Sequence, residues 1–198
     1  MRKVVFLLAV IVSAVSNAQE NRTVSTNRKV DLGLSVYWSG YNLGTSSPEN
    51  CGYYISWGES EHKELYDETN CIYNNRNIGS DISGTRYDAA STLWGGSWRM
   101  PTWNEWQELI DECSWVWTTY KAVNGYIVTG PNGNSIFLPA NGYAMGNGIE
   151  FKGERGCYNS SIANGTNRSC NISFSESGQF QDDYKRQYGL GIRPVCNK

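Results

Sequence analysis

A helical pattern of apolar residues is the clearest signal in the chain. Thr102 and Glu105 form a Thr-x-x-Glu capping box, in which each side chain satisfies a backbone N–H group at the start of a helix. Directly after this box, apolar residues recur at positions i, i+3, i+4 and i+7. These residues are Trp106, Leu109, Ile110 and Cys113. The spacing predicts an amphipathic helix over residues 103–113, entered from an aromatic, glycine-bent loop.

Shorter patterns predict a second helix and several strands. Asp88 is suited to cap a short helix over residues 89–93. Asn-Gly pairs punctuate the second half of the chain, and both residue types tolerate the positive φ of two-residue hairpin turns. The expected strands lie at residues 36–38, 53–57, 126–129, 135–138, 171–174 and 190–195. The pattern predicts one α+β domain over residues 30–198, with long loops, helices first and antiparallel strands second.

The amino terminus has the pattern of a secretory signal peptide over residues 1–18. Two basic residues precede an apolar run at 4–12, and small residues at 16 and 18 allow cleavage. The run is too short to cross a bilayer, and no later segment is long and apolar enough to do so. We therefore expect a secreted, periplasmic or cell-surface protein with no membrane insertion of the mature chain. Residues 19–29 are polar and are expected to form a flexible tail.

The net charge and the absence of known motifs argue against several classes of function. The net charge of −2 provides no basic surface for nucleic acid or anionic lipid. No phosphate-binding loop, dinucleotide fingerprint or nucleophile elbow is present. His62 is the single histidine, so a zinc site or a Cys–His catalytic pair is poorly supported. The segment 59–68 carries several carboxylates, and we expect it to be a solvent-exposed charged loop. We expect no enzymatic activity, no cofactor and no bound metal.

Six cysteines remain after the predicted cleavage site. An even number of cysteines in an exported chain favours disulfide bonds. Cys157 and Cys170 flank an Asn-Gly turn signal and could face each other across a hairpin. The sequence alone does not choose among the possible connectivities.

An ordered series of motifs covers residues 30 to 196 and resembles a known family. It includes VDLGLSVYW at 30–38, GYY at 52–54, WGE at 57–59, DAA at 88–90, WGGSWRMPT at 94–102, NSIFLPA at 134–140, GY at 142–143 and GLGIRPV at 189–195. The series is similar to the Fibrobacter succinogenes major paralogous domain, found in secreted Bacteroidetes-type proteins. That group is related to the formylglycine-generating-enzyme-like branch of C-type lectin folds. The resemblance implies a C-type lectin-like domain, with a small twisted antiparallel sheet, one or two helices and long loops.

The resemblance also implies a ligand-binding surface near the carboxyl terminus, over residues 158–188. Tyr offers rigid contact area there, and Ser and Asn offer adaptable hydrogen bonds. The alternative is that these polar residues are merely solvated. The candidate ligand-binding residues are Asn159, Ser161, Asn167, Arg168, Asn171, Ser173, Gln181, Asp183, Tyr184, Arg186 and Tyr188.

The same resemblance suggests a disulfide pairing and an alternative activity. A helix-to-last-strand bridge, as in C-type lectins, would join Cys113 to Cys196, which leaves Cys51 with Cys71 beside the Cys157–Cys170 pair. Formylglycine-generating relatives use a reactive cysteine pair in this half of the chain.

We therefore predict a binding or adhesion module at the cell surface, whose partner is a glycan or a surface protein. A thiol-dependent enzyme using Cys157 or Cys170, and a structural cell-surface subunit, are the alternatives.

Overall fold

The computed structural model describes residues 24–26 and 28–198. The predicted signal peptide and the first part of the predicted tail lie outside the described residues. The described chain forms two α-helices, one 3-10 helix and fourteen strands. The helices are α1 (Ala89–Trp94) and α2 (Trp103–Glu112), and the 3-10 helix is η1 (Glu68–Asn70).

The fourteen strands form four antiparallel sheets. The first has the order β1 (Val30–Asp31), β2 (Val36–Trp38), β14 (Val195–Asn197) and β4 (Trp98–Arg99). The second has the order β3 (Ile55–Ser56), β13 (Gly189–Leu190), β8 (Tyr143–Met145) and β9 (Gly148–Glu150). The third contains β5 (Ser114–Tyr120), β6 (Val123–Thr129) and β7 (Ser135–Pro139), and the fourth contains β10 (Arg155–Asn164), β11 (Arg168–Ser175) and β12 (Gly178–Lys185).

The α+β, C-type lectin-like arrangement predicted from the sequence is wrong. Strands make up 41% of the described residues and helices only 11%, and the strands are divided among four small sheets. Both predicted helices are present, but β5, β10 and β12 occupy stretches for which the sequence analysis predicted no strand. β10 and β12 are rich in Ser, Asn, Gln and Asp, residue types that are not enriched in strands, so the sequence pattern underestimated the strand content.

Only some of the Asn-Gly turn signals mark hairpin turns. Asn132-Gly133 and Asn164-Gly165 lie in the turns after β6 and β10, where both glycines have positive φ. Asn124-Gly125 instead lies inside β6, and the preceding turn uses Lys121 and Ala122 at φ of 47° and 65°. A Cβ at Gly125 would lie 2.2 Å from the carbonyl oxygen of Leu138, so this glycine permits close strand packing.

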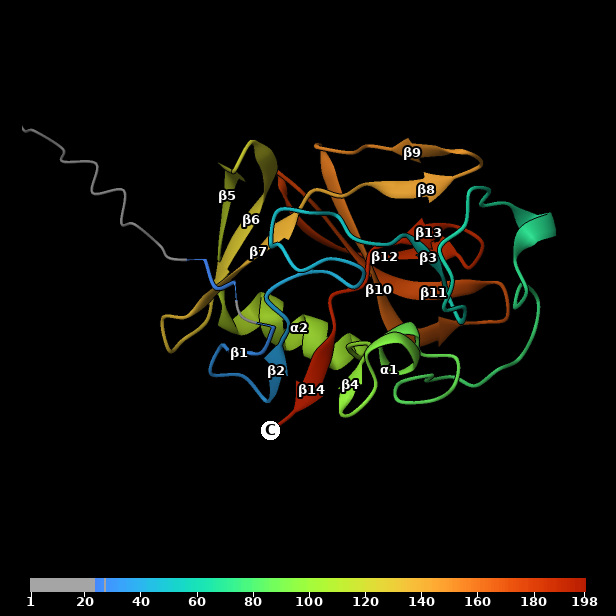
Figure 1. Cartoon of the computed structure of the whole chain (residues 1–198), viewed down its shortest axis with the longest axis horizontal. Helices are drawn as coiled ribbons and strands as arrows, with labels where there is room; N and C mark the ends of the chain where they lie inside the picture. The colour runs from blue at the N-terminus through green and yellow to red at the C-terminus, as the bar shows by residue number, and fades with distance from the viewer. Residues whose placement is uncertain (1–23, 27) are drawn as a thin grey trace, which may run out of the picture.

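The main core lies between α2 and the strands around it. In Figure 1, α2 runs between the β5–β7 sheet at one end of the molecule and α1 at the other, beneath the β10–β12 sheet. Its Trp106 packs 4.8 Å from Trp38 and 5.8 Å from Tyr158, measured between ring centroids. Trp106 and Leu109 are both buried, as the predicted apolar face requires.

A buried arginine near the carboxyl terminus links the segment after β2 to strand β7. Arg193 is fully buried in the segment between β13 and β14, and it donates hydrogen bonds to Asn42 Oδ1, Ser39 O and Phe137 O at 2.9, 3.1 and 2.7 Å. Burial lowers the pKa of Arg193 to about 10. The strand predicted over 190–195 is therefore two separate strands with a buried polar anchor between them.

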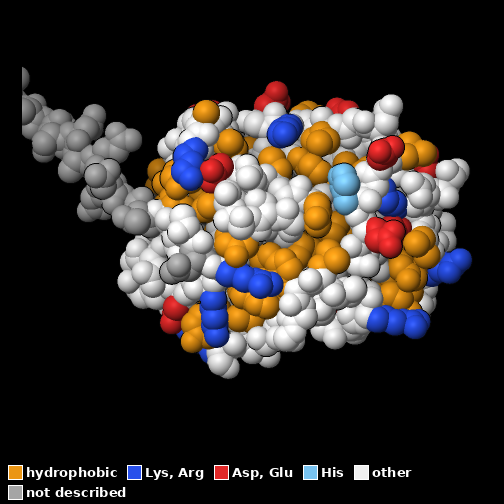
Figure 2. Space-filling model, in the orientation of Figure 1, with side chains coloured by type: hydrophobic (Ala, Val, Ile, Leu, Met, Phe, Trp, Pro, Cys, Tyr) orange, Lys and Arg blue, Asp and Glu red, His pale blue; other side chains and the backbone are white. Residues whose placement is uncertain are grey.

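Aromatic residues also reach the surface. Figure 2 shows hydrophobic side chains across the middle of one face, with Lys and Arg side chains beside them. Trp94 and Trp98 pack edge to face with their centroids 5.2 Å apart, and the guanidinium of Arg28 lies 4.0 Å from the centroid of Trp94. This cation–π contact holds the segment before β1 against the end of α1.

Candidate functional site

The structure buries most of the contact surface predicted over residues 158–188. The buried members are Asn159, Ser161, Asn171, Ser173, Tyr184 and Arg186, none more than 9% exposed. They cannot form an exposed binding surface, so this part of the prediction is wrong. The two asparagines among them bond inside the fold: Asn171 Nδ2 donates to Asn159 Oδ1 at 3.0 Å, and the backbone N–H of Tyr184 donates to Asn171 Oδ1 at 2.7 Å.

Arg186 shows why sequence pattern was misleading here. Its guanidinium lies 4.2 Å from the Trp57 ring centroid and donates to the carbonyl oxygens of Tyr73, Arg76, Gly165 and Arg168. The loop between β3 and α1 covers this arginine, and burial lowers its pKa. A residue predicted to contact a ligand thus holds the long loop against the β10–β12 sheet.

Five predicted residues keep some exposure, but only three of them gather in one place. Asn167 is exposed at the β10–β11 turn, and Tyr188 packs against Tyr143 with ring centroids 5.6 Å apart. Arg168, Gln181 and Asp183 lie on β11 and β12. In the antiparallel register, Cys170 lies opposite Asp183 and Ile172 opposite Gln181, so these side chains share one face of the sheet.

That face forms a shallow hollow beside the first residue of α2. The hollow has a volume of about 350 Å³. It is lined by Trp103, Asn164, Cys170, Gln181, Asp182 and Asp183. We call it the Trp103 hollow. It brings two predicted residues, Gln181 and Asp183, together with an indole and an amide that the prediction had not included.

Hydrogen bonds fix the polar wall of the Trp103 hollow. Asp183 Oδ1 accepts from Arg168 Nε at 2.6 Å, and Asp183 Oδ2 accepts from Asn164 Nδ2 at 2.6 Å. Gln181 donates from its amide to Gln107 on α2. A carboxylate has about four lone-pair sites, so Asp183 retains acceptor capacity for a further donor.

Trp103 differs from the other seven tryptophans. Trp38, Trp57 and Trp106 lie in the core, Trp94, Trp115 and Trp117 pack against it, and Trp98 packs against Trp94. Among the described residues, Trp103 belongs to no core cluster and makes no ring contact or side-chain hydrogen bond. Its indole is half-buried at the rim of the hollow. Packing of the fold therefore does not explain why this position carries the largest side chain.

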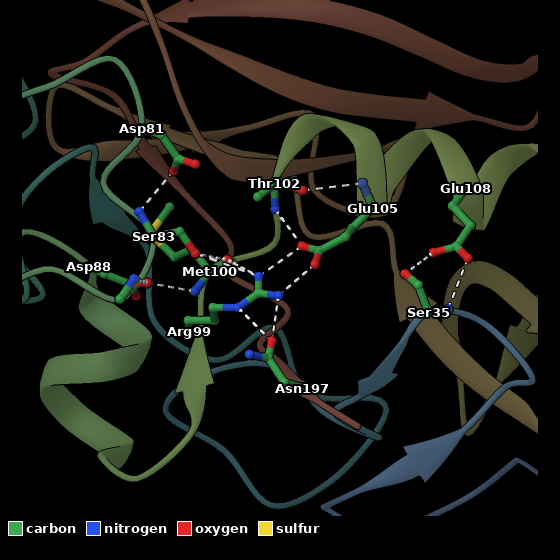
Figure 3. Close-up of polar contacts among 11 residues, drawn as sticks. Ser35, Asp81, Ser83, Asp88, Arg99, Met100, Thr102, Glu105, Glu108 and Asn197 are labelled. Carbon is green, nitrogen blue, oxygen red and sulfur yellow. Dashed lines mark hydrogen bonds and ion pairs between the residues drawn. The ribbon is translucent and has the colours of Figure 1, made fainter.

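A hydrogen-bond network fixes the helix end that carries Trp103 (Figure 3). Glu105 Oε2 accepts from Thr102 N and from Arg99 Nη1, both at 2.8 Å, and the predicted capping box is confirmed. Arg99 also donates to Asn197 Oδ1 at 2.8 Å, which ties the helix start to the last strand. Burial would raise the pKa of Glu105, but the bonds from Arg99 and Thr102 outweigh burial and lower it.

A larger cavity of about 540 Å³ lies on the loop between β3 and α1. Its deepest polar group, Glu59, is 6% exposed, so this residue does not belong to the solvated loop that the sequence suggested. Glu59 accepts from Ile72 N at 2.8 Å and pairs with Lys63 Nζ at 2.8 Å. Lys63 in turn donates to the Asn70 carbonyl. These groups bond one another and hold the loop closed.

All six cysteines lie among the described residues, and all six are free thiols. The strand register explains why the hairpin pair does not form. Cys157 lies opposite Ser173, whereas Cys170 lies opposite Asp183. The structure therefore contains none of the three predicted bonds, Cys51–Cys71, Cys113–Cys196 and Cys157–Cys170.

The cysteine environments do not favour thiol catalysis. Burial raises the pKa of Cys157 to about 11 and also raises the pKa of Cys170. Because the thiolate is the nucleophilic form, a raised pKa reduces reactivity at neutral pH. Within residues 24–26 and 28–198, no group of three or more His, Cys, Asp or Glu side chains could hold a metal ion.

Comparisons with family models, curated proteins and solved structures find no match for this chain. The family resemblance therefore remains a prediction. Neither described helix has the length and apolar character that a membrane span requires.

Proposed function

We propose that this protein is an exported binding module that recognises a saccharide through the Trp103 hollow. The half-buried indole of Trp103, which belongs to no core cluster of the described fold, is the observation that carries the proposal. It lies beside carboxylate and amide side chains on a rigid strand pair. Cys170 is the one thiol in the lining, and burial raises its pKa, which disfavours the nucleophilic thiolate. Binding is therefore the activity that the site supports best.

The chemistry of a sugar ring suits this arrangement. One face of a pyranose carries C–H groups, which pack against an aromatic ring, and its edges carry hydroxyl groups that donate and accept hydrogen bonds. In the Trp103 hollow, Asp183 offers an acceptor, and Gln181 and Asn164 offer both donor and acceptor atoms. The hollow is shallow, so we expect it to hold one or two sugar units of a longer chain, with modest affinity.

The predicted export also supports this function. An apolar run at the amino terminus indicates a signal peptide, and a cell-surface or secreted location would bring the protein to extracellular glycans.

Binding to a glycan array, followed by calorimetry with the best saccharide, tests the proposal. We expect Trp103→Ala to weaken binding about tenfold or more, because about 1.5 kcal/mol of apolar contact is lost. Phe180→Ala is the matched control. Phe180 is an exposed aromatic residue on β12, the strand that carries Gln181 and Asp183, and it pairs with Ser173 on the opposite sheet face. Equal effects of the two substitutions, or no saccharide binding by the unmodified protein, would contradict the proposal.

A further inference from the structure

Two long strands lie at the open edges of their sheets, and their sequences differ in charge. β12 ends the order β10-β11-β12, and β5 ends the order β5-β6-β7. Open edges present unpaired backbone groups to other chains, and natural proteins usually protect them with charge, proline, bulges or a covering segment. The question at each edge is therefore what protects it.

The β12 edge is protected. Asp182, Asp183 and Lys185 place charges along the strand. The backbone N–H of Asp183 bonds Asp182 Oδ1 at 2.8 Å, and its carbonyl accepts from the Arg168 guanidinium. Lys185 pairs with Glu68 of η1 at 2.9 Å. A strand from another chain would have to displace these interactions.

The β5 edge lacks these protections. Its sequence, SWVWTTY, contains no charged residue, proline or glycine, and it consists mainly of aromatic and β-branched residues. Among the described residues, the backbone of β5 pairs only with β6. Val116 is 41% exposed, and β5 is the outermost strand at its end of the molecule (Figure 1). An uncharged seven-residue segment of this type is a template for strand addition.

The opposite edge of the same sheet is already covered from within the chain. Val24 forms a parallel bridge with Ser135 of β7, and Ser25 N donates to Ser135 O at 2.9 Å. The free edge of β5 is therefore where a further strand can be added to this sheet.

We propose that β5 pairs antiparallel with β5 of a second copy, so that two three-stranded sheets become one continuous sheet. The sequence is self-complementary when the two-fold axis passes through Trp117. Val116 then lies opposite Thr118 of the partner subunit, and Trp117 lies opposite its own counterpart. Aromatic and β-branched cross-strand pairs stabilise a sheet, and no like charges meet. The same residues form both halves of the interface, as closed two-fold dimers require.

The test measures self-association by sedimentation velocity across a range of protein concentrations. We expect a concentration-dependent monomer–dimer equilibrium for the unmodified protein. Two double variants differ at a single position. In V116E/T118E, carboxylates at positions 116 and 118 oppose each other in the dimer, whereas in V116E/T118K each carboxylate opposes an ammonium group. We expect the second variant to dimerise at least about tenfold more tightly than the first.

A control variant tests whether the effect on association depends on the β5 pairing or results from any added surface charge. Ile149→Glu changes a similarly exposed apolar residue on the β9 edge and should leave the dimer unchanged. Circular dichroism verifies that each variant is folded. The proposal is overturned if the unmodified protein remains monomeric at every concentration, or if the two double variants associate equally. Neither result bears on the Trp103 hollow, because the hollow lies on different strands.

Discussion

The β10–β12 sheet and the β5–β7 sheet use their polar and apolar residues in opposite ways. The β10–β12 sheet is rich in Asn and Ser, yet Asn159, Asn171 and Ser173 are almost fully buried. The β5–β7 sheet has an outer strand of Trp, Val, Thr and Tyr, yet Val116 is substantially exposed. Residue type alone therefore does not reveal which surface is available for contact.

The difference follows from what covers each sheet. The long loop between β3 and α1 packs on the β10–β12 sheet, and its carbonyl groups accept the hydrogen bonds of Arg186. Buried polar side chains are stable when they find such partners. No comparable segment of the described chain pairs with the free edge of β5. The polar sheet thus contributes to the structure of the fold, whereas the apolar edge remains free to contact another chain.

The largest expected effect tests the buried polar anchor. Arg186→Met should destabilise the protein by about 3 kcal/mol or more, because several buried carbonyl groups lose their donor. Arg168→Met is the matched control, since Arg168 pairs with Asp183 at the surface, where the two side chains are 39% and 37% exposed. Its expected cost is at most about 1 kcal/mol. Urea unfolding measures both, and equal losses would contradict the burial of Arg186.

A second prediction concerns how the stability of the protein at alkaline pH depends on Cys157, a buried thiol of β10. The folded protein keeps Cys157 protonated to about pH 11, whereas the unfolded chain ionises at its usual pKa of 9.0. The unfolded state therefore releases its proton first. Stability is fully present below pH 9.0 and falls as the pH rises towards about 11.

The expected loss from this one thiol is about 2 kcal/mol between about pH 8 and about pH 10.5. Cys157→Ala should lose correspondingly less over the same interval, whatever its stability at neutral pH. Unfolding free energies at the two pH values measure this difference. Identical losses in the two proteins would show that Cys157 does not titrate as a buried thiol.

Local signals in the sequence predicted the helices well. The capping box at Thr102 and the apolar spacing after it placed α2 to within a residue at its carboxyl end. Asp88 caps α1 as expected, with its carboxylate accepting from Ser91 N at 3.0 Å. These elements depend on neighbours within a few residues, so the sequence contains the information needed to find them.

Long-range pairing was not predictable in the same way. β12 looks like a polar loop, because Gln, Asp and Lys are poor indicators of a strand, and its pairing with β11 determines its structure. The predicted binding residues that the structure buries were misassigned for the same reason. Asn171 faces inward because of its register, and a shift of one residue would reverse this. The Trp103 indole was assigned to the first helical turn, and only the tertiary structure shows that it lies beside Gln181 and Asp183.

The smallest expected effect concerns the apolar edge. If the exposed Val116 serves association more than folding, Val116→Thr should change the free energy of unfolding by no more than about 0.5 kcal/mol. Val128→Thr makes the same substitution on the neighbouring strand β6, where the side chain is fully buried. The added hydroxyl group would be buried there, at a cost of about 1–3 kcal/mol. Unfolding at a protein concentration low enough to keep the monomer measures both values. A large loss for Val116→Thr would place this residue in the folded core of each copy, and the contrast between the two sheets would then disappear.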